Sequence, residues 1–156
     1  MKIFVLLMIV VYAAGCIKID HFEKTSKIPS REWYYDNKPQ FSFDVSDTSL
    51  SYNIYITLRH TDGYKYNNIW LRLGSKFPGD STRFQNIDLV LASDAKGWEG
   101  TGLNDIYEVR KLISRGSVAF ARPGEYTFSV EQIMRENPLQ NVLNVGIRIE
   151  KAGMQP

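Results

Sequence analysis

The chain of 156 residues carries 19 Lys and Arg against 17 Asp and Glu, so its formal net charge is only +2. Without a cluster of basic residues, this balance argues against a nucleic-acid-binding protein. Hydrophobic residues make up 44% of the sequence and aromatic residues 13%, which is ordinary for a folded domain. A chain of this length fits a single domain behind any targeting segment.

The first fifteen residues are typical of a secretory signal peptide. Lys2 supplies a positive charge, an uncharged apolar run follows from Ile3 to Ala14, and the small residue Gly15 ends the segment. The apolar run is 12 residues long, whereas a transmembrane helix needs roughly 20. We therefore predict that residues 1–15 are a signal peptide and not a membrane span.

Cys16, the only cysteine, follows this segment directly, so the chain cannot form an internal disulfide. The residues before it, 13–15, are Ala, Ala and Gly, and with Cys16 they resemble the bacterial lipobox, in which the cysteine is acylated. Two or more acyl chains give a durable membrane anchor, since each buried methylene contributes about 0.8 kcal/mol. We predict that acyl chains on Cys16 hold the mature protein on a membrane.

The next residue favours one of the two membranes. Ile17 stands where enteric bacteria place the Asp that retains lipoproteins at the inner membrane. We therefore expect an envelope protein on the outer membrane, facing the periplasm. Residues 16–32 are polar and mixed in charge, which predicts a tether containing a solvated His21, with a loose first strand near its end as an open alternative. The folded domain is expected at 33–156.

Alternation of polar and apolar residues, the signature of half-buried strands, dominates the rest of the chain. It predicts strands at 40–45, 51–59, 68–73, 83–92, 117–121, 125–130 and 142–150. Gly-containing and Pro-containing turns separate many of these segments. Short strands at regular spacing predict an all-β fold, a two-sheet antiparallel β-sandwich with jelly-roll-like topology.

Two segments are less regular. Residues 105–113 fit either a strand or a helix, and we favour a strand because strands surround them. Residues 131–139 do not alternate, and there we predict one short helical turn.

The sequence contains little that could support catalysis. Its two histidines are not accompanied by a Gly-x-Ser-x-Gly nucleophile motif, by zinc-ligand spacing or by a Gly-Lys-Ser/Thr phosphate loop. A pair of carboxylates from Glu99, Asp105 and Glu108 leaves a glycoside hydrolase open as a remote alternative. We expect a non-enzymatic protein with no metal ion or cofactor.

Aromatic residues are the remaining candidates for a binding surface. Tyr64, Tyr66 and Trp70 cluster around a predicted turn, and Arg59 lies just before it. Exposed aromatic side chains stack on sugars or anchor protein partners, although aromatic residues more often belong to the packing of a small domain. These four residues are our candidate partner or ligand surface.

Three segments behind the lipobox are together specific enough to suggest a family. They comprise residues 52–61 with Tyr64, Tyr66 and 68–70; residues 96–102 with Asp105 and Ile106; and residues 124–128 with Glu131, Gln132, Met134, Arg135, Leu139 and 145–150. In order, spacing and length they resemble the gliding-motility lipoprotein H (GldH) family of Bacteroidota.

This resemblance implies a role in gliding motility and in the protein-secretion machinery linked to it, with no catalytic residues. Only Cys16 carries over as a functional position. We therefore expect a membrane-anchored envelope lipoprotein that acts through protein-protein contacts. The alternative is a carbohydrate-binding accessory lipoprotein that uses exposed aromatic residues of the sandwich to bind a sugar.

Overall fold

The computed structural model describes residues 21–153, so the predicted signal peptide and Cys16 lie outside the described residues. Within that range the chain forms fourteen strands and one 3-10 helix. No helix of residues 21–153 has the length and apolar character needed to cross a membrane. The strands are β1 (His21–Lys27), β2 (Glu32–Trp33), β3 (Gln40–Val45), β4 (Ser51–Thr61), β5 (Asn68–Lys76), β6 (Arg83–Val90), β7 (Ala92–Ser93), β8 (Gly97–Trp98), β9 (Thr101–Leu103), β10 (Ile106–Leu112), β11 (Val118–Ala119), β12 (Gly124–Gln132), β13 (Leu139–Gln140) and β14 (Val142–Lys151).

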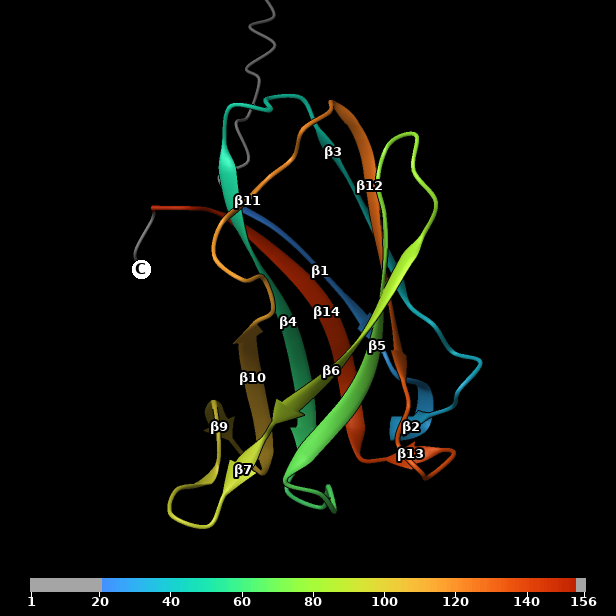
Figure 1. Cartoon of the computed structure of the whole chain (residues 1–156). Helices are drawn as coiled ribbons and strands as arrows, with labels where there is room; N and C mark the ends of the chain where they lie inside the picture. Colours follow the sequence, from blue (N-terminus) through green and yellow to red (C-terminus); the bar gives the residue numbers. More distant parts are fainter. Residues whose placement is uncertain (1–20, 154–156) are drawn as a thin grey trace, which may run out of the picture.

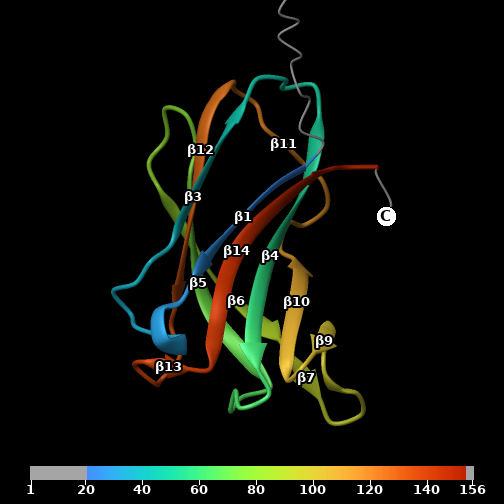
Figure 2. The same ribbon diagram turned by 180° about the vertical axis from the view of Figure 1, so that it is seen from behind.

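The long strands form two antiparallel sheets. The first has the order β1-β14-β4-β10-β9, with β11 also paired to β4, and the second has the order β3-β12-β5-β6. Figure 1 shows β5 and β6 in front of β4 and β14, and the reverse view in Figure 2 brings β1, β14, β4 and β10 to the front. The sheets are thus the two layers of a sandwich.

The strand order identifies the topology. Among the eight longest strands the first pairs with the last, β1 with β14, and the second with the seventh, β3 with β12. The third pairs with the sixth, β4 with β10, and the fourth with the fifth, β5 with β6. Such nested pairing folded into two four-stranded sheets is the jelly roll. The predicted jelly-roll-like β-sandwich is confirmed.

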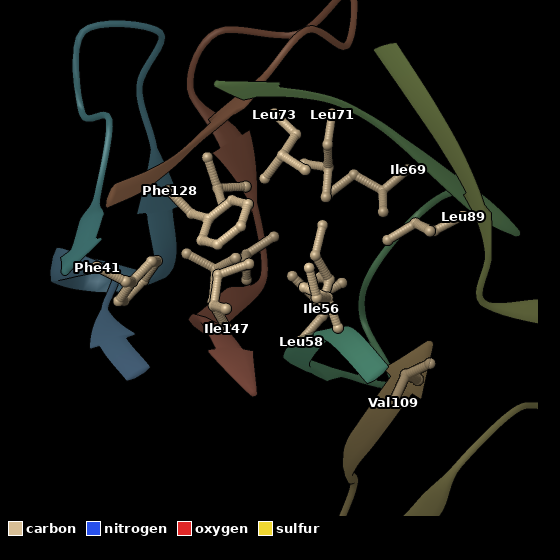
Figure 3. Packing of buried hydrophobic residues seen from close by; sticks show 14 of the residues in the cluster. Phe41, Ile56, Leu58, Ile69, Leu71, Leu73, Leu89, Val109, Phe128 and Ile147 are labelled. Carbon is tan, nitrogen blue, oxygen red and sulfur yellow. The ribbon is translucent and has the colours of Figure 1, made fainter. Parts of the chain in front are cut away.

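The core lies between the two sheets. Leu71 and Leu73 of β5 face Ile56 of β4 and Ile147 of β14, all of them at most 3% exposed (Figure 3). They come from alternating positions because successive strand residues point to opposite faces. Each such side chain contributes roughly 1.5–3 kcal/mol by burial. The alternation in the sequence therefore identified the inner face of both sheets.

The predicted helical turn at 131–139 is wrong. β12 continues to Gln132, bends follow, and β13 begins at Leu139. Pro138 disfavours a helical conformation for the residue before it. The one helix of the described residues is the 3-10 turn η1 (Pro29–Arg31). By contrast, the ambiguous segment 105–113 is the strand β10, as predicted.

The predicted boundary between tether and domain at residue 33 is also wrong. His21–Lys27 form β1, which pairs with β14 along its whole length from His21 opposite Glu150 to Lys27 opposite Asn144. An edge strand is positioned by main-chain hydrogen bonds, so it tolerates polar side chains. For this reason the sequence of β1 resembles that of a tether. Phe22 packs on Phe43 of β3, with ring centroids 5.1 Å apart. The folded domain has therefore begun by His21.

The two ends of the sandwich are distinct. β1 begins and β14 ends at one end, where β4 also begins, and we call this the N-terminal end. β4 ends at Thr61 and β5 begins at Asn68 at the opposite end, which we call the far end; β2, β7, β9 and β13 lie there in Figure 1. The 11 residues of β4 span roughly 35 Å at 3.3 Å per residue.

Candidate functional site

A groove of about 350 Å³ lies at the far end of the sandwich. Its lining consists of Tyr66, Trp70, Ile133, Met134 and Arg135, and we call it the far-end groove. Tyr66 and Trp70 belong to the β4–β5 loop and β5, whereas the other three follow β12. Two of the four residues predicted as a binding surface therefore line this groove.

The main chain of Trp70 links the two sides of the groove. The backbone N–H of Trp70 donates to Sδ of Met134 over 3.1 Å. The carbonyl of Trp70 accepts a hydrogen bond from the N–H of Ile133 over 3.0 Å. These hydrogen bonds do not involve the indole, and Trp70 is 43% exposed. A large aromatic side chain is thus presented to solvent by an immobilised backbone.

A buried amide holds the loop that forms the second side of the groove. Gln132 is 1% exposed, and its Nε2 donates to the carbonyl oxygens of Trp33 and Glu136, each over 3.1 Å. Its Oε1 accepts a hydrogen bond from the backbone N–H of Met134 over 2.9 Å. Both amide protons and the amide oxygen are therefore used inside the protein. Sequence reasoning missed this role, although Gln132 stood among the residues that suggested the family.

Tyr35 fastens the same loop from a third side. Its hydroxyl donates to the carbonyl of Met134 over 2.8 Å, and its backbone N–H donates to Oδ1 of Asn137 over 2.9 Å. With Gln132, these bonds occupy the N–H and the carbonyl of Met134. The loop is therefore set in shape before any ligand binds.

The rim of the groove is charged. Arg135 is exposed and forms no ion pair with any residue between 21 and 153. Its neighbour Glu136 pairs with Lys65, with 3.6 Å between Oε1 and Nζ. Hydrogen bonding to Glu136 raises the pKa of the Tyr66 phenol, so this hydroxyl stays neutral. Arg135 is thus the cation of the lining that remains available.

Tyr64 does not belong to the groove, contrary to the prediction that grouped it with Tyr66 and Trp70. It is 3% exposed, and its hydroxyl donates to the carbonyl of Asn68 over 3.0 Å. Burial raises the pKa of its phenol well above the ordinary value. Tyr64 is a core residue because the β4–β5 loop folds inward at this position.

Tyr64 packs against His60, the centre of an aromatic cluster at the far end. The His60 ring is fully buried and lies 5.4 Å from Tyr64, 4.6 Å from Trp98 and 5.7 Å from Tyr107, measured between ring centroids. Its Nδ1–H donates to the carbonyl of Thr61 over 2.8 Å, which leaves Nε2 as an acceptor. That nitrogen has no hydrogen-bond partner among the described residues.

This environment makes His60 a structural residue. Burial lowers the pKa of the imidazole, so the ring is neutral in the folded protein. No serine hydroxyl or carboxylate bonds to it within residues 21–153, and a hydrolase triad around His60 is therefore not formed there. The other histidine, His21, lies exposed on β1 at the N-terminal end.

Arg59 does not line the groove. Successive side chains of β4 point to opposite faces of the sheet, and that of Arg59 is on the exposed face. It lies opposite Glu108 of β10 in the first sheet, and the two side chains form an ion pair with 3.5 Å between Nε and Oε2. Both side chains are about half exposed. The structure therefore brings together Tyr66 and Trp70 and leaves Arg59 and Tyr64 elsewhere.

The three carboxylates considered for glycoside hydrolysis have other surroundings. Glu108 pairs with Arg59, and Glu99 pairs with Lys111. Asp105 lies exposed in the β9–β10 turn, where its φ of 62° is left-handed. Among residues 21–153 no cluster of three His, Cys, Asp or Glu could hold a metal ion.

Comparison with known proteins agrees with the resemblance seen in the sequence. Residues 20–149 match the model of the family described as GldH lipoprotein. A "Gliding motility lipoprotein GldH homolog" of Christiangramia forsetii is 27% identical over 158 residues, covering 97% of this chain and 96% of the relative. The "Gliding motility lipoprotein GldH" of Flavobacterium johnsoniae is 27% identical over 154 residues, covering 94% of both chains.

Among solved structures, the subviral particle of infectious bursal disease virus VP2 aligns with 85% of this chain and 33% of the viral chain, at 12% identity and a TM-score of 0.33.

The family match spans most of the chain, and the two relatives named above align over nearly their whole length. The chain therefore belongs to the GldH lipoprotein family.

Proposed function

We propose that this protein is anchored in the cell envelope by acyl chains on Cys16 and acts without catalysis, by presenting the far-end groove to a protein partner. The partner belongs to the apparatus of gliding motility or to the secretion machinery linked to it. Membership of a lipoprotein family and the names of two relatives support this role. As part of the same proposal, we assign the anchor to the outer membrane, facing the periplasm.

The observation that carries the proposal is the position and rigidity of the far-end groove. Cys16 precedes His21 by five positions, and His21 lies at the N-terminal end of the sandwich. The groove lies at the opposite end, roughly 35 Å away along β4. A preformed loop costs less free energy to order on binding than a flexible one. This geometry supports the proposal, because the groove lies away from the end that acyl chains on Cys16 would hold.

The lining also favours a protein partner. Aromatic residues, Met and Arg are enriched at protein interfaces, and Trp, Tyr and Arg dominate binding hot spots. The far-end groove is lined by Trp70, Tyr66, Met134, Arg135 and one further apolar residue. A sugar site also uses exposed aromatic rings, so the exposed Trp70 keeps the carbohydrate-binding alternative as the second candidate.

The experiment compares two substitutions in the organism's own cells. Trp70→Ala is expected to abolish surface spreading and reduce protein secretion, while the lipoprotein stays in the membrane at its normal amount. Phe84→Ala removes a still more exposed ring, 63% exposed on β6, and is expected to change neither readout. Normal spreading and secretion in the Trp70→Ala cells would contradict a role for the groove.

Cys16→Ser tests the anchor separately. We expect it to abolish metabolic labelling with palmitate and to release the protein from the membrane fraction. Persistence of both labelling and membrane retention would show that Cys16 is not the anchor.

A further inference from the structure

We infer that the far-end groove recognises an acidic peptide segment of its partner: one large apolar side chain enters the groove, and an adjacent carboxylate binds Arg135. This inference deepens the proposed function and rests on it. It specifies the chemistry of the partner, which neither the family nor the names of its relatives describe.

The size of the groove sets the size of the bound group. At about 350 Å³ it lies at the lower end of the 300–1,000 Å³ that ligand sites enclose. Such a space accepts one or two side chains. A stable protein interface buries about 800 Å² on each partner. The groove is therefore the anchor point of a larger contact, and the group that enters it is a side chain of the partner.

The lining selects an apolar side chain. It combines the apolar residues Ile133 and Met134 with the aromatic residues Tyr66 and Trp70. Methionine adapts its shape to different apolar groups and contacts aromatic rings favourably. An aromatic or branched aliphatic side chain is therefore the group that this lining accommodates best.

The hydrogen-bonding groups of the lining are mostly occupied already. The N–H of Met134 binds Gln132, its carbonyl binds the hydroxyl of Tyr35, and its Sδ accepts from Trp70. Tyr66 interacts with Glu136. The groups that remain, the guanidinium of Arg135 and the indole N–H of Trp70, only donate. The hydroxyls of a sugar would find few acceptors here, and buried hydroxyls without partners are costly. This distribution favours a peptide over a glycan.

Charge selects the group next to the apolar side chain. Glu131 is shared by Lys38 and Arg72, with Oε2 2.6 Å from the first cation and Oε1 3.6 Å from the second. One acid thus faces two cations beside the groove. Asp88, which lies opposite Trp70 on β6, accepts a hydrogen bond from Asn68 over 2.8 Å. The bond from the neutral amide of Asn68 leaves the charge of Asp88 in place. The cations around the groove, Lys38, Lys65, Arg72 and Arg135, outnumber the acids Glu131, Glu136 and Asp88, so the surroundings of the groove retain a positive balance.

Arg135 provides the contact itself. It is exposed, it lines the groove, and it has no ion pair within residues 21–153. Its guanidinium offers five N–H donors in a planar fork that matches a carboxylate, and such charge-assisted pairs are about twice as strong as neutral hydrogen bonds. A partner segment with a carboxylate next to a large apolar side chain would therefore fill the groove and bind Arg135 at the same time.

The test selects peptides on the full lipoprotein in lipid nanodiscs. A random displayed peptide library is panned against the wild-type protein, and dissociation constants of synthetic copies are measured by calorimetry. Enriched sequences are expected to contain a large apolar residue next to Asp or Glu. Their affinity should fall about tenfold or more with Arg135→Glu, and panning against that variant should enrich Lys or Arg at the same position.

Two further variants identify the binding site. Trp70→Ala is expected to abolish binding of the peptides selected on either protein. Arg115→Glu is the matched control, because Arg115 is an exposed arginine between β10 and β11 and does not line the groove. It reverses the same charge and should leave the affinities unchanged.

Three outcomes would overturn the inference: enriched peptides without an acidic residue, affinities unchanged by Arg135→Glu, or no peptide that depends on Trp70. Trp70-dependent peptides without an acidic preference would overturn the charge recognition and leave the proposed function standing. Binding on a glycan array that is lost with Trp70→Ala, together with failure of the peptide selection, would replace both with the carbohydrate alternative.

Discussion

The two ends of the sandwich differ in what holds their loops in place. At the far end, the buried side chain of Gln132 bonds to Trp33, 99 residues away in the sequence. At the N-terminal end, the bond that joins two loops comes from an exposed side chain: Nη1 of Arg122 donates to the carbonyl of Pro78 over 2.9 Å, 44 residues away. Buried polar networks rigidify a structure when they are fully satisfied. The comparison indicates that the far end is the prebuilt end, which suits recognition.

The largest effect on this difference between the two ends is expected from removing the side-chain amide of Gln132. Gln132→Leu leaves the Met134 N–H and two carbonyl groups without their partner, so we expect a loss of about 2–4 kcal/mol in the free energy of unfolding. Urea denaturation measures it. Gln140→Leu is the control, because the half-buried Gln140 makes one side-chain bond to Glu32, and it should cost less than about 1 kcal/mol. Equal losses would contradict the special role of Gln132.

The second prediction concerns pH and His60. Burial lowers the folded-state pKa of His60 below the ordinary 6.5, so the unfolded chain binds a proton more readily. The stability that comes from this group is present above the unfolded pKa and is lost as pH falls towards the folded pKa. Each unit by which the pKa is lowered is worth about 1.4 kcal/mol.

The measurement is urea denaturation between pH 8 and pH 5. The wild-type protein should lose stability as pH falls from about 6.5, the unfolded pKa of histidine, and His60→Gln should lose less over the same interval. His21→Gln, at the exposed histidine on β1, should retain the wild-type slope. If the pH dependence disappeared with His21→Gln instead, the assignment of this effect to His60 would be contradicted.

A smaller effect is expected at the N-terminal end. The hydroxyl of Tyr126 donates to the carbonyl of Arg122, four residues away, over 2.8 Å. The same hydroxyl accepts a longer bond from the Arg122 N–H over 3.4 Å. Tyr126→Phe keeps the buried ring and removes both bonds, so we expect a loss of about 1 kcal/mol, measured by thermal or urea unfolding. A loss as large as that of Gln132→Leu would remove the difference between the two ends.

The smallest effect on stability should come from Trp70→Ala. The backbone bonds of Trp70 to Ile133 and Met134 do not require the indole, and the exposed side chain lies outside the core. We expect a change within about 0.5 kcal/mol in unfolding, together with loss of peptide binding. Phe84→Ala should change the free energy of unfolding equally little and should retain peptide binding. A large destabilisation would mean that Trp70 is packed and not presented.

Much of the fold was predictable because strand alternation is a local property. The segment 40–45 is β3 to the residue, and 51–59 and 68–73 lie within β4 and β5. β1 was predicted as part of a tether, with only a loose strand near its end, because an edge strand exposes its side chains and receives its position from β14. The segment after Gln132 was misassigned because its shape depends on a side chain bonded to a distant residue, Trp33.

For the candidate site, the sequence by itself identified the aromatic residues Tyr66 and Trp70, and Cys16 remains its predicted anchor. Only the tertiary structure decided that Ile133, Met134 and Arg135 complete the groove, and that Tyr64 and Arg59 lie outside it. Sequence periodicity reports which face of a strand is buried. Which loops meet at one end of a sandwich depends on strand order and register, which are set by main-chain pairing between residues far apart in the chain.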